Sequence, residues 1–266
     1  MDTSSTTYAP SARLPPVLLF DLNGTLTDNF AGISLSILHT FAVLGATPPT
    51  PDELRACVGP PLRRSFVRLL ATDDPKQIEC ALSHYRMRYA ETGWLENALC
   101  EGMTEVVTAL AAAGATLHVC TSKPQPYAER IVGHFGLAPH FASICGADLA
   151  GVLDDKAKLV AHLLARAHLD PGDCAMIGDR DHDVHAAHAN GVRAVGVLWG
   201  YGTRVELEHA GADVIVETPG ALARAGFARA SNLGSVRDPC ARRAGHSRPA
   251  RTPVSRRCSG PRPPDP

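Results

Sequence analysis

Hydrophobic positions follow two different periods along the chain. Residues 17–20 form an uninterrupted apolar run that ends at Asp21, a pattern typical of a buried parallel strand. From residue 29 to about residue 100, apolar side chains recur every three or four positions instead, as in AGISLSILHTFAVLG at 31–45. This stretch is therefore predicted to be helical throughout, with no strand inside it.

From residue 103 onward, helical and strand patterns alternate. Such alternation predicts a parallel sheet with helices on both faces, and so an α/β fold. Helices are expected at 103–114, 125–136, 155–168 and 181–191, and strands at 116–122, 141–146, 173–179, 193–199 and 212–217. The chain then divides into a core, residues 16–28 and 101–228, and a small all-helical cap, residues 29–100, inserted after the first strand.

The two ends of the chain lack apolar periodicity. Residues 1–15 are expected to be a flexible tail, and residues 229–266 a disordered Arg/Pro-rich tail. That second segment has nine Arg, no Lys, two Asp and no Glu, so its charge is +7, while the rest of the chain carries −8. An acidic body does not favour nucleic-acid binding.

The cysteines and the lengths of the apolar stretches indicate the cellular location of the protein. The eight cysteines include no CxxC pair, so neither a zinc motif nor a redox motif is predicted, and reduced thiols are expected. No apolar stretch has the length of a signal peptide or of a membrane span. We expect a cytoplasmic protein without a membrane partner.

Polar residues gather where the predicted strands end. Ligands of open parallel sheets bind at the carboxyl ends of the strands, so these residues should share one rim. A lysine, Lys156, opens the helix before the fourth strand of the sheet. The strand-end residues are Asp21, Asn23, Thr25, Thr121, Ser122, Lys123, Asp179, Asp181 and Asp183.

Each residue type has a physical task if the ligand is a phosphate ester. Asp21 is a candidate nucleophile for covalent phosphoryl transfer. Asp179 and Asp21 supply the oxygen ligands that Mg²⁺ prefers. Lys156 and Thr121 can neutralise and hydrogen-bond the phosphoryl oxygens. Gly24 lets the backbone approach the phosphate closely.

The motifs DLNGTLTD, TSK, DDK and GDRDHD resemble, in order and spacing, the four motifs of the haloacid dehalogenase (HAD) superfamily. The segments VGPPLRRSF and GVLWGYGT resemble its phosphoglycolate phosphatase-like and 5′-nucleotidase-like branch. The resemblance covers roughly residues 16–225 and implies a Rossmann-like, HAD-like core under a helical cap. It also implies a Mg²⁺-dependent phosphatase of small-molecule phosphate monoesters, as a monomer or homodimer.

The resemblance also assigns roles by position. Asp21 would be the nucleophile, Thr121 and Lys156 would bind the phosphoryl group, and Lys158 is a weaker candidate for the lysine. Magnesium would be held by Asp21, Asp179, Asp183 and the backbone carbonyl of Asn23. Substrate contacts are expected from Gly24, Thr25, Ser122 and, in the cap, Arg63, with Arg64 and Tyr85 as further candidates.

Position 23 departs from the family pattern. The related phosphatases carry an aspartate there, which protonates the leaving group and then activates water, and the amide of Asn23 can do neither. Loss of general acid–base catalysis costs about 10²–10⁴ in rate. Three interpretations remain open: a slow phosphatase, an inactive pseudo-phosphatase that binds phosphate ligands, and a dehalogenase, whose halide leaving group needs no proton.

Overall fold

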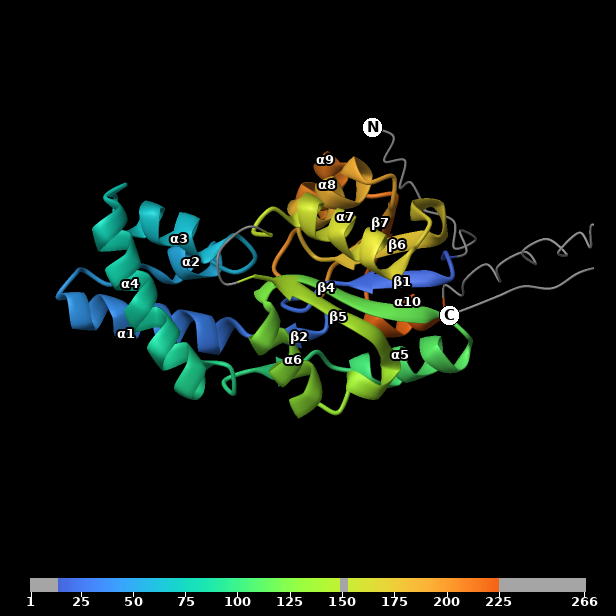
Figure 1. Ribbon diagram of the computed structural model, residues 1–266, viewed down its shortest axis with the longest axis horizontal. Helices are drawn as coiled ribbons and strands as arrows, with labels where there is room; N and C mark the ends of the chain where they lie inside the picture. Colours follow the sequence, from blue (N-terminus) through green and yellow to red (C-terminus); the bar gives the residue numbers. More distant parts are fainter. Residues whose placement is uncertain (1–13, 149–152, 225–266) are drawn as a thin grey trace, which may run out of the picture. The chain divides into compact units, whose positions relative to one another are not determined.

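The computed structural model describes residues 14–148 and 153–224, and it confirms the α/β prediction (Figure 1). Six parallel strands form one sheet in the order β5-β4-β1-β6-β7-β8. The strands are β1 (Val17–Phe20), β4 (Thr116–Pro124), β5 (Phe141–Ala147), β6 (Cys174–Gly178), β7 (Arg193–Val197) and β8 (Val214–Val216). Since β1 lies between β4 and β6, the loops that carry the predicted motifs start from three adjacent strands.

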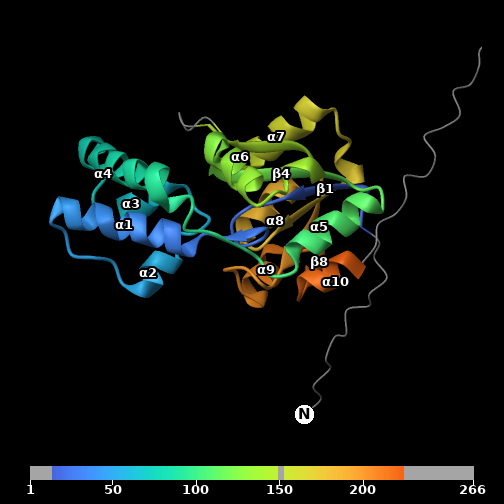
Figure 2. The same ribbon diagram turned by 90° about the horizontal axis from the view of Figure 1, so that it is seen from below.

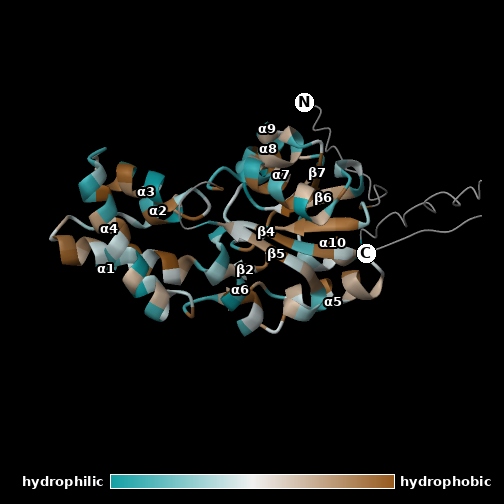
Figure 3. Cartoon of the chain, viewed as in Figure 1, coloured by the Kyte–Doolittle hydropathy of each residue, from teal (hydrophilic) through white to brown (hydrophobic). Residues whose placement is uncertain are grey.

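Helices cover both faces of the sheet, and each face has its own hydrophobic cluster. One cluster packs α5 (Met103–Ala112), α6 (Gln125–His134) and α10 (Pro219–Arg224) on the sheet, and the other packs α7 (Lys156–Ala167), α8 (Asp181–Ala189) and α9 (Arg204–Ala210). Short 3₁₀ turns lie at Ala138–His140 and Pro171–Asp173. Brown, hydrophobic ribbon lies in the middle of the sheet, whereas the ribbon of β5 is largely pale (Figure 3). A sheet buried on both faces explains why β1, β6 and β8 are continuous apolar runs rather than alternating ones.

The cap consists of helices that pack around a hydrophobic cluster of their own. Its elements are α1 (Phe30–Leu44), α2 (Pro51–Arg55), α3 (Leu62–Leu69), α4 (Pro75–Arg88) and a π-helix, η1 (Tyr89–Gly93) (Figure 2). Local signals fix the ends: Gly45 ends α1 in the left-handed conformation, and Thr50 and Glu53 form a capping box at the start of α2. A separate cluster indicates a subdomain that can pack without the core.

Two boundaries differ from the prediction. Leu14, assigned to the flexible tail, is fully buried in the first core cluster, because its apolar side chain fills the base of the sheet before β1. The stretch predicted to lack strands contains β3 (Ala98–Leu99), which pairs antiparallel with β2 (Thr27–Asp28). This two-stranded sheet joins the segments that enter and leave the cap.

Other expectations concern residues at the edges of the described ranges. The disorder predicted for residues 229–266, and for most of residues 1–15, lies outside the described residues. Within those that are described, the six cysteines are free, and no helix combines the length and the apolar character needed to cross a bilayer.

We expect the core to fold without the cap. Replacing residues 30–96 by a short linker keeps β2 and β3 and removes a cluster that is distinct from both core clusters. The product should stay soluble and retain an α/β circular dichroism spectrum. An unfolded or aggregated product would show that the packing of Trp94, which borders both the cap cluster and the core, holds the two together.

Candidate active site

Three buried carboxylates meet at the carboxyl ends of β1 and β6. Asp21 follows β1, Asp179 follows β6, and Asp183 lies in the first turn of α8. One oxygen of each lies within 4.8 Å of the others, and all three side chains are buried. Parallel strand order brings them together although more than 150 residues separate the first from the other two.

Lys156, the first residue of α7, lies between two of these carboxylates. Its Nζ donates to Asp21 Oδ1 at 2.6 Å and lies 2.6 Å from Asp183 Oδ1. The second contact is an ion pair without hydrogen-bond geometry, so Asp183 Oδ1 has no hydrogen-bond donor among the described residues. Burial alone would lower the pKa of Lys156, but the charges of Asp183 and Asp21 outweigh it and raise that pKa.

Asp179 is held in a tight glycine-lined space. Its Oδ2 accepts from the backbone N–H of Tyr201 at 2.8 Å, and its Oδ1 accepts from Thr25 Oγ1 at 3.4 Å. Gly24 has φ +83°, and a Cβ there would lie 2.3 Å from Asp179 Oδ2. Burial, together with the charges of Asp183 and Asp21, raises the pKa of Asp179 to about 8. The cluster therefore carries more negative charge than Lys156 alone can compensate.

The carboxylate cluster fits a hard divalent cation. Three buried carboxylates surround a single lysine, and the pKa of Asp179 is raised. All donors are oxygens, which Mg²⁺ prefers, and no sulfur or imidazole belongs to the group. A cation bound there would relieve the repulsion that raises the pKa of Asp179.

Removal of Lys156 should destabilise the protein strongly. Lys156→Met leaves Asp21 and Asp183 as uncompensated buried charges, so the free energy of unfolding should fall by about 3–5 kcal/mol in urea denaturation without metal. Lys158→Met is the matched control, because Lys158 lies on the same helix but is exposed. Equal unfolding midpoints for the two variants would contradict the ion-pair account.

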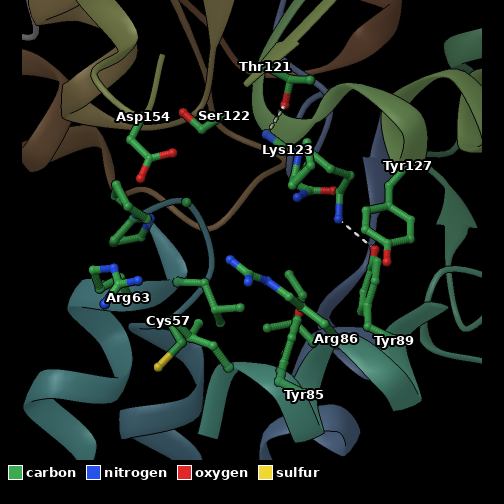
Figure 4. Close-up of a pocket in the computed structure, with 18 of the residues that line it drawn as sticks. Cys57, Arg63, Tyr85, Arg86, Tyr89, Thr121, Ser122, Lys123, Tyr127 and Asp154 are labelled. Atoms are coloured by element: carbon green, nitrogen blue, oxygen red, sulfur yellow. Dashed lines mark hydrogen bonds between the residues drawn. The ribbon is translucent and has the colours of Figure 1, made fainter. Parts of the chain in front are cut away.

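A cavity opens beside the carboxylates, between core loops and cap helices (Figure 4). It encloses about 160 Å³, more than ten times the ~10–15 Å³ that one water requires, so a small organic phosphate can fit. The core side contributes Asp21, Asn23, Thr121, Ser122 and Lys123, and the cap side Cys57, Arg63, Tyr85, Arg86 and Tyr89.

The predicted site residues divide into three groups. Asp21, Asn23, Thr121, Ser122 and Arg63 line the cavity, although Arg63 is half-exposed and forms an ion pair with Glu79. Asp179, Asp183 and Lys156 build the carboxylate cluster. Gly24 and Thr25 lie against Asp179, and their expected contact with substrate stays a prediction.

The structure also places residues at the cavity that had no predicted role. Arg86 extends from α4 into the cavity in Figure 4. Lys123 is buried and bonded to Tyr89 and Asn29, at the junction of cap and core. Lys123 directly follows the strand predicted at 116–122, two residues after Thr121. That position at a strand end was the sequence feature that could have identified it as a site residue. The sequence gives no comparable indication for Tyr89 or Asn29, because their role depends on how the cap meets the core.

Comparison with known proteins agrees with this geometry. Residues 18–197 match the family described as haloacid dehalogenase-like hydrolase. A 5′-nucleotidase of Pseudomonas aeruginosa is 42% identical over 192 residues, which cover 72% of this chain and 86% of that protein. A phosphoglycolate phosphatase of Agrobacterium fabrum is 32% identical over 234 residues, covering 85% and 98%. The predicted resemblance to this family is thereby confirmed.

Two further proteins are similar to this chain. The tyrosine-protein kinase PtkA of Mycobacterium tuberculosis is 40% identical over 188 residues, which cover 71% of this chain but only 64% of that protein. The crystal structure of a predicted phosphatase from Clostridium acetobutylicum superposes with a TM-score of 0.75 at 34% identity, covering 79% of this chain and 97% of that one. The fold with its cap is therefore shared with solved relatives.

Proposed function

Because the chain belongs to the haloacid dehalogenase-like hydrolases, we propose that it is a Mg²⁺-dependent phosphatase of small phosphate monoesters that works through a phosphorylated Asp21. The observation that carries the proposal is the buried group of Asp21, Asp179, Asp183 and Lys156 beside a partly open cavity. The small volume of this cavity, about 160 Å³, favours small esters, of the phosphoglycolate or nucleotide kind, over a phosphorylated protein.

Each residue of the site has its own role in the reaction. Asp21, held by Lys156 at the floor of the cavity, attacks phosphorus and forms the aspartyl-phosphate. Thr121 and Ser122, from the end of β4, hydrogen-bond the phosphoryl oxygens, and Lys156 balances their charge. Magnesium held by Asp21, Asp179, Asp183 and the Asn23 carbonyl would supply further charge stabilisation.

Asn23 limits this chemistry. It lines the same cavity as Asp21, and its Oδ1 is buried with no donor among the described residues. An amide neither protonates the leaving oxygen nor deprotonates water, so both halves of the reaction should be slow. The fold and the phosphoryl-binding groups do not depend on an acid at position 23, and the protein is therefore an impaired phosphatase.

The same observation supports a second candidate. With both proton transfers lost, the site would retain its groups for phosphate and metal but complete no catalytic cycle. The chain would then be a pseudo-phosphatase that binds phosphate ligands.

A panel assay separates the two candidates. Hydrolysis of small phosphate esters should require Mg²⁺ and disappear in Asp21→Asn, which keeps the size of the side chain but removes its nucleophilic carboxylate. If no ester is hydrolysed but phosphate analogues still bind in a magnesium-dependent manner, the pseudo-phosphatase is the better description. If neither hydrolysis nor binding is seen, both candidates are wrong.

A further inference from the structure

Lys123 is a buried lysine whose hydrogen bonds go to neutral groups. Its Nζ donates to Tyr89 Oη at 2.6 Å and to Asn29 Oδ1 at 3.0 Å, and it lies 4.6 Å from the centre of the Tyr89 ring. The residue is 7% exposed, and it lines the cavity with Asp21 and Asn23. A buried ammonium without a hydrogen-bonded carboxylate loses hydration that it does not regain from an ion pair.

The neighbours of Lys123 hold it at the junction of cap and core. Tyr89 Oη also donates to Asn29 Oδ1 at 2.5 Å, and Asn29 Nδ2 donates to the backbone carbonyls of Gly93 and Glu96 at 3.3 and 3.1 Å. Asn29 and Glu96 lie on the two segments that connect the cap to the core. The lysine therefore contacts one connection directly, at Asn29, and the other through Asn29, and Figure 4 shows its side chain directed at Tyr89.

The charges around Lys123 leave it able to exchange a proton near neutral pH. The groups that face it are Asp21 from the end of β1, the phenol of Tyr89, with Tyr85 and Tyr127 packed on that ring, and the neutral Asn29. Burial lowers the pKa of Lys123 to about 7, and the charge of Asp21 opposes this shift only in part. Burial raises the pKa of Tyr89, so its phenol stays protonated.

Building on the proposed phosphatase function, we propose that Lys123 is the catalytic acid and base that replaces the carboxylate absent at position 23, with Asn29 and Tyr89 as its positioning residues. Asp21 attacks phosphorus, the bond from phosphorus to the ester oxygen breaks, and that oxygen takes a proton from the Lys123 ammonium. Water then attacks the aspartyl-phosphate and gives its proton to the Lys123 amine, the bond from phosphorus to Asp21 breaks, and inorganic phosphate leaves.

Other titratable side chains at the cavity are less suited. His182 lies with its ring nitrogens 3.6 Å from Asp181 Oδ1 and 4.0 Å from Asp183 Oδ1, so it belongs to the acidic cluster. Arg63 and Arg86 carry guanidinium groups, which are suited to binding anions rather than to exchanging protons. Burial raises the pKa of Tyr85 well above its usual value. Asp148 and Asp154 also line the cavity, but both are only half-buried, whereas Lys123 combines enclosure, a fixed position and a proton that can leave.

A double-mutant cycle between positions 23 and 123 tests the proposal. Lys123→Met, close in shape but without a proton to exchange, should lower kcat on alkyl phosphates about 10²-fold, at the lower end of acid–base effects. In the Asn23→Asp background the same change should cost only a few-fold, since the carboxylate then transfers the protons. Urea unfolding of each variant checks that the fold is intact.

The pH profile provides a readout that a purely structural lysine would not change. Alkyl esters need the protonated ammonium for departure, so kcat should fall as pH rises through about 7. Activated aryl esters release their alcohol without protonation, so their turnover is limited by activation of water by the neutral Lys123 amine. For these esters kcat should therefore rise through the same pH. Both inflections should vanish in Lys123→Met.

The outcomes are distinct. Equal losses in both backgrounds would assign Lys123 a structural or anion-binding role and overturn the proposal, as would unchanged turnover in Lys123→Met; either result leaves the phosphatase function standing. Absence of turnover in every variant, Asn23→Asp included, would overturn the phosphatase function together with this proposal.

Discussion

Asn23→Asp should raise kcat on alkyl phosphates by about 10²-fold, the part of the ~10²–10⁴ range of general acid–base catalysis that Lys123 does not already supply. The side chain at position 23 lines the cavity next to Asp21, and its Oδ1 is buried without a donor, so a carboxyl group of the same size can occupy its place. The gain should appear in kcat rather than in KM, because the interaction belongs to the transition state.

Three controls keep this result interpretable. Asn23→Ala removes the amide without adding an acid and should bring no gain. The first step with activated aryl phosphates should be accelerated less, because their alcohol leaves without protonation. Asn23 precedes Gly24, a pair prone to deamidation, so fresh protein and a mass check are needed. Unaltered protein that hydrolyses alkyl phosphates near 10 s⁻¹, about the median for enzymes, would contradict the claim that Asn23 impairs catalysis.

Asp179→Ala should abolish detectable Mg²⁺ binding and, with it, turnover. Asp179 is one of three carboxylates whose oxygens meet within 4.8 Å, and the loops around it contain glycines packed so closely that no other side chain fits. Isothermal titration calorimetry with Mg²⁺ alone measures the effect. Asp181→Ala is the matched control, since Asp181 begins α8 only two residues after Asp179 and its side chain is half-exposed. Unchanged magnesium affinity in Asp179→Ala would remove the metal assignment.

The same titration has a pH dependence of known sign. In the metal-free protein the pKa of Asp179 is raised to about 8, so at pH 7 the cation must displace a proton. Affinity for Mg²⁺ should therefore rise with pH up to about 8 and then level off, with proton release that shrinks over the same interval. Affinity that is flat between pH 6 and 9 would show that Asp179 is already ionised.

The sheet and its rim were predictable because they depend on local pattern and on general rules of topology. Apolar runs locate β1 and β6, and the residues that follow them must meet at one edge once the strands are parallel. Asp21, Asp179 and Lys156 were therefore identified without any knowledge of distances. The separate cap followed equally from the change of period after Asp28.

What the sequence did not reveal depends on contacts between distant segments. Gly24 and Thr25 were expected to contact substrate, and the sequence did not indicate that the turn after β1 also places them against Asp179. Leu14 lies in a polar stretch, and its burial depends on packing below β1. Lys123 was marked only by its place at the end of a strand, because its environment is created by Asn29 and Tyr89, 94 and 34 residues away along the chain.

The central claim is that Asp21 becomes phosphorylated during turnover, and it can be measured directly. Fresh protein should be mixed with an activated aryl phosphate and Mg²⁺, quenched in acid and analysed by peptide mass spectrometry. Because an aryl alcohol departs without protonation and hydrolysis of the aspartyl-phosphate then limits turnover, the phosphorylated form should accumulate after a burst of aryl alcohol, with the modification on Asp21 and none in Asp21→Asn. Product formation at an undiminished rate in Asp21→Asn, or a phosphoryl group found on another residue, would contradict the account.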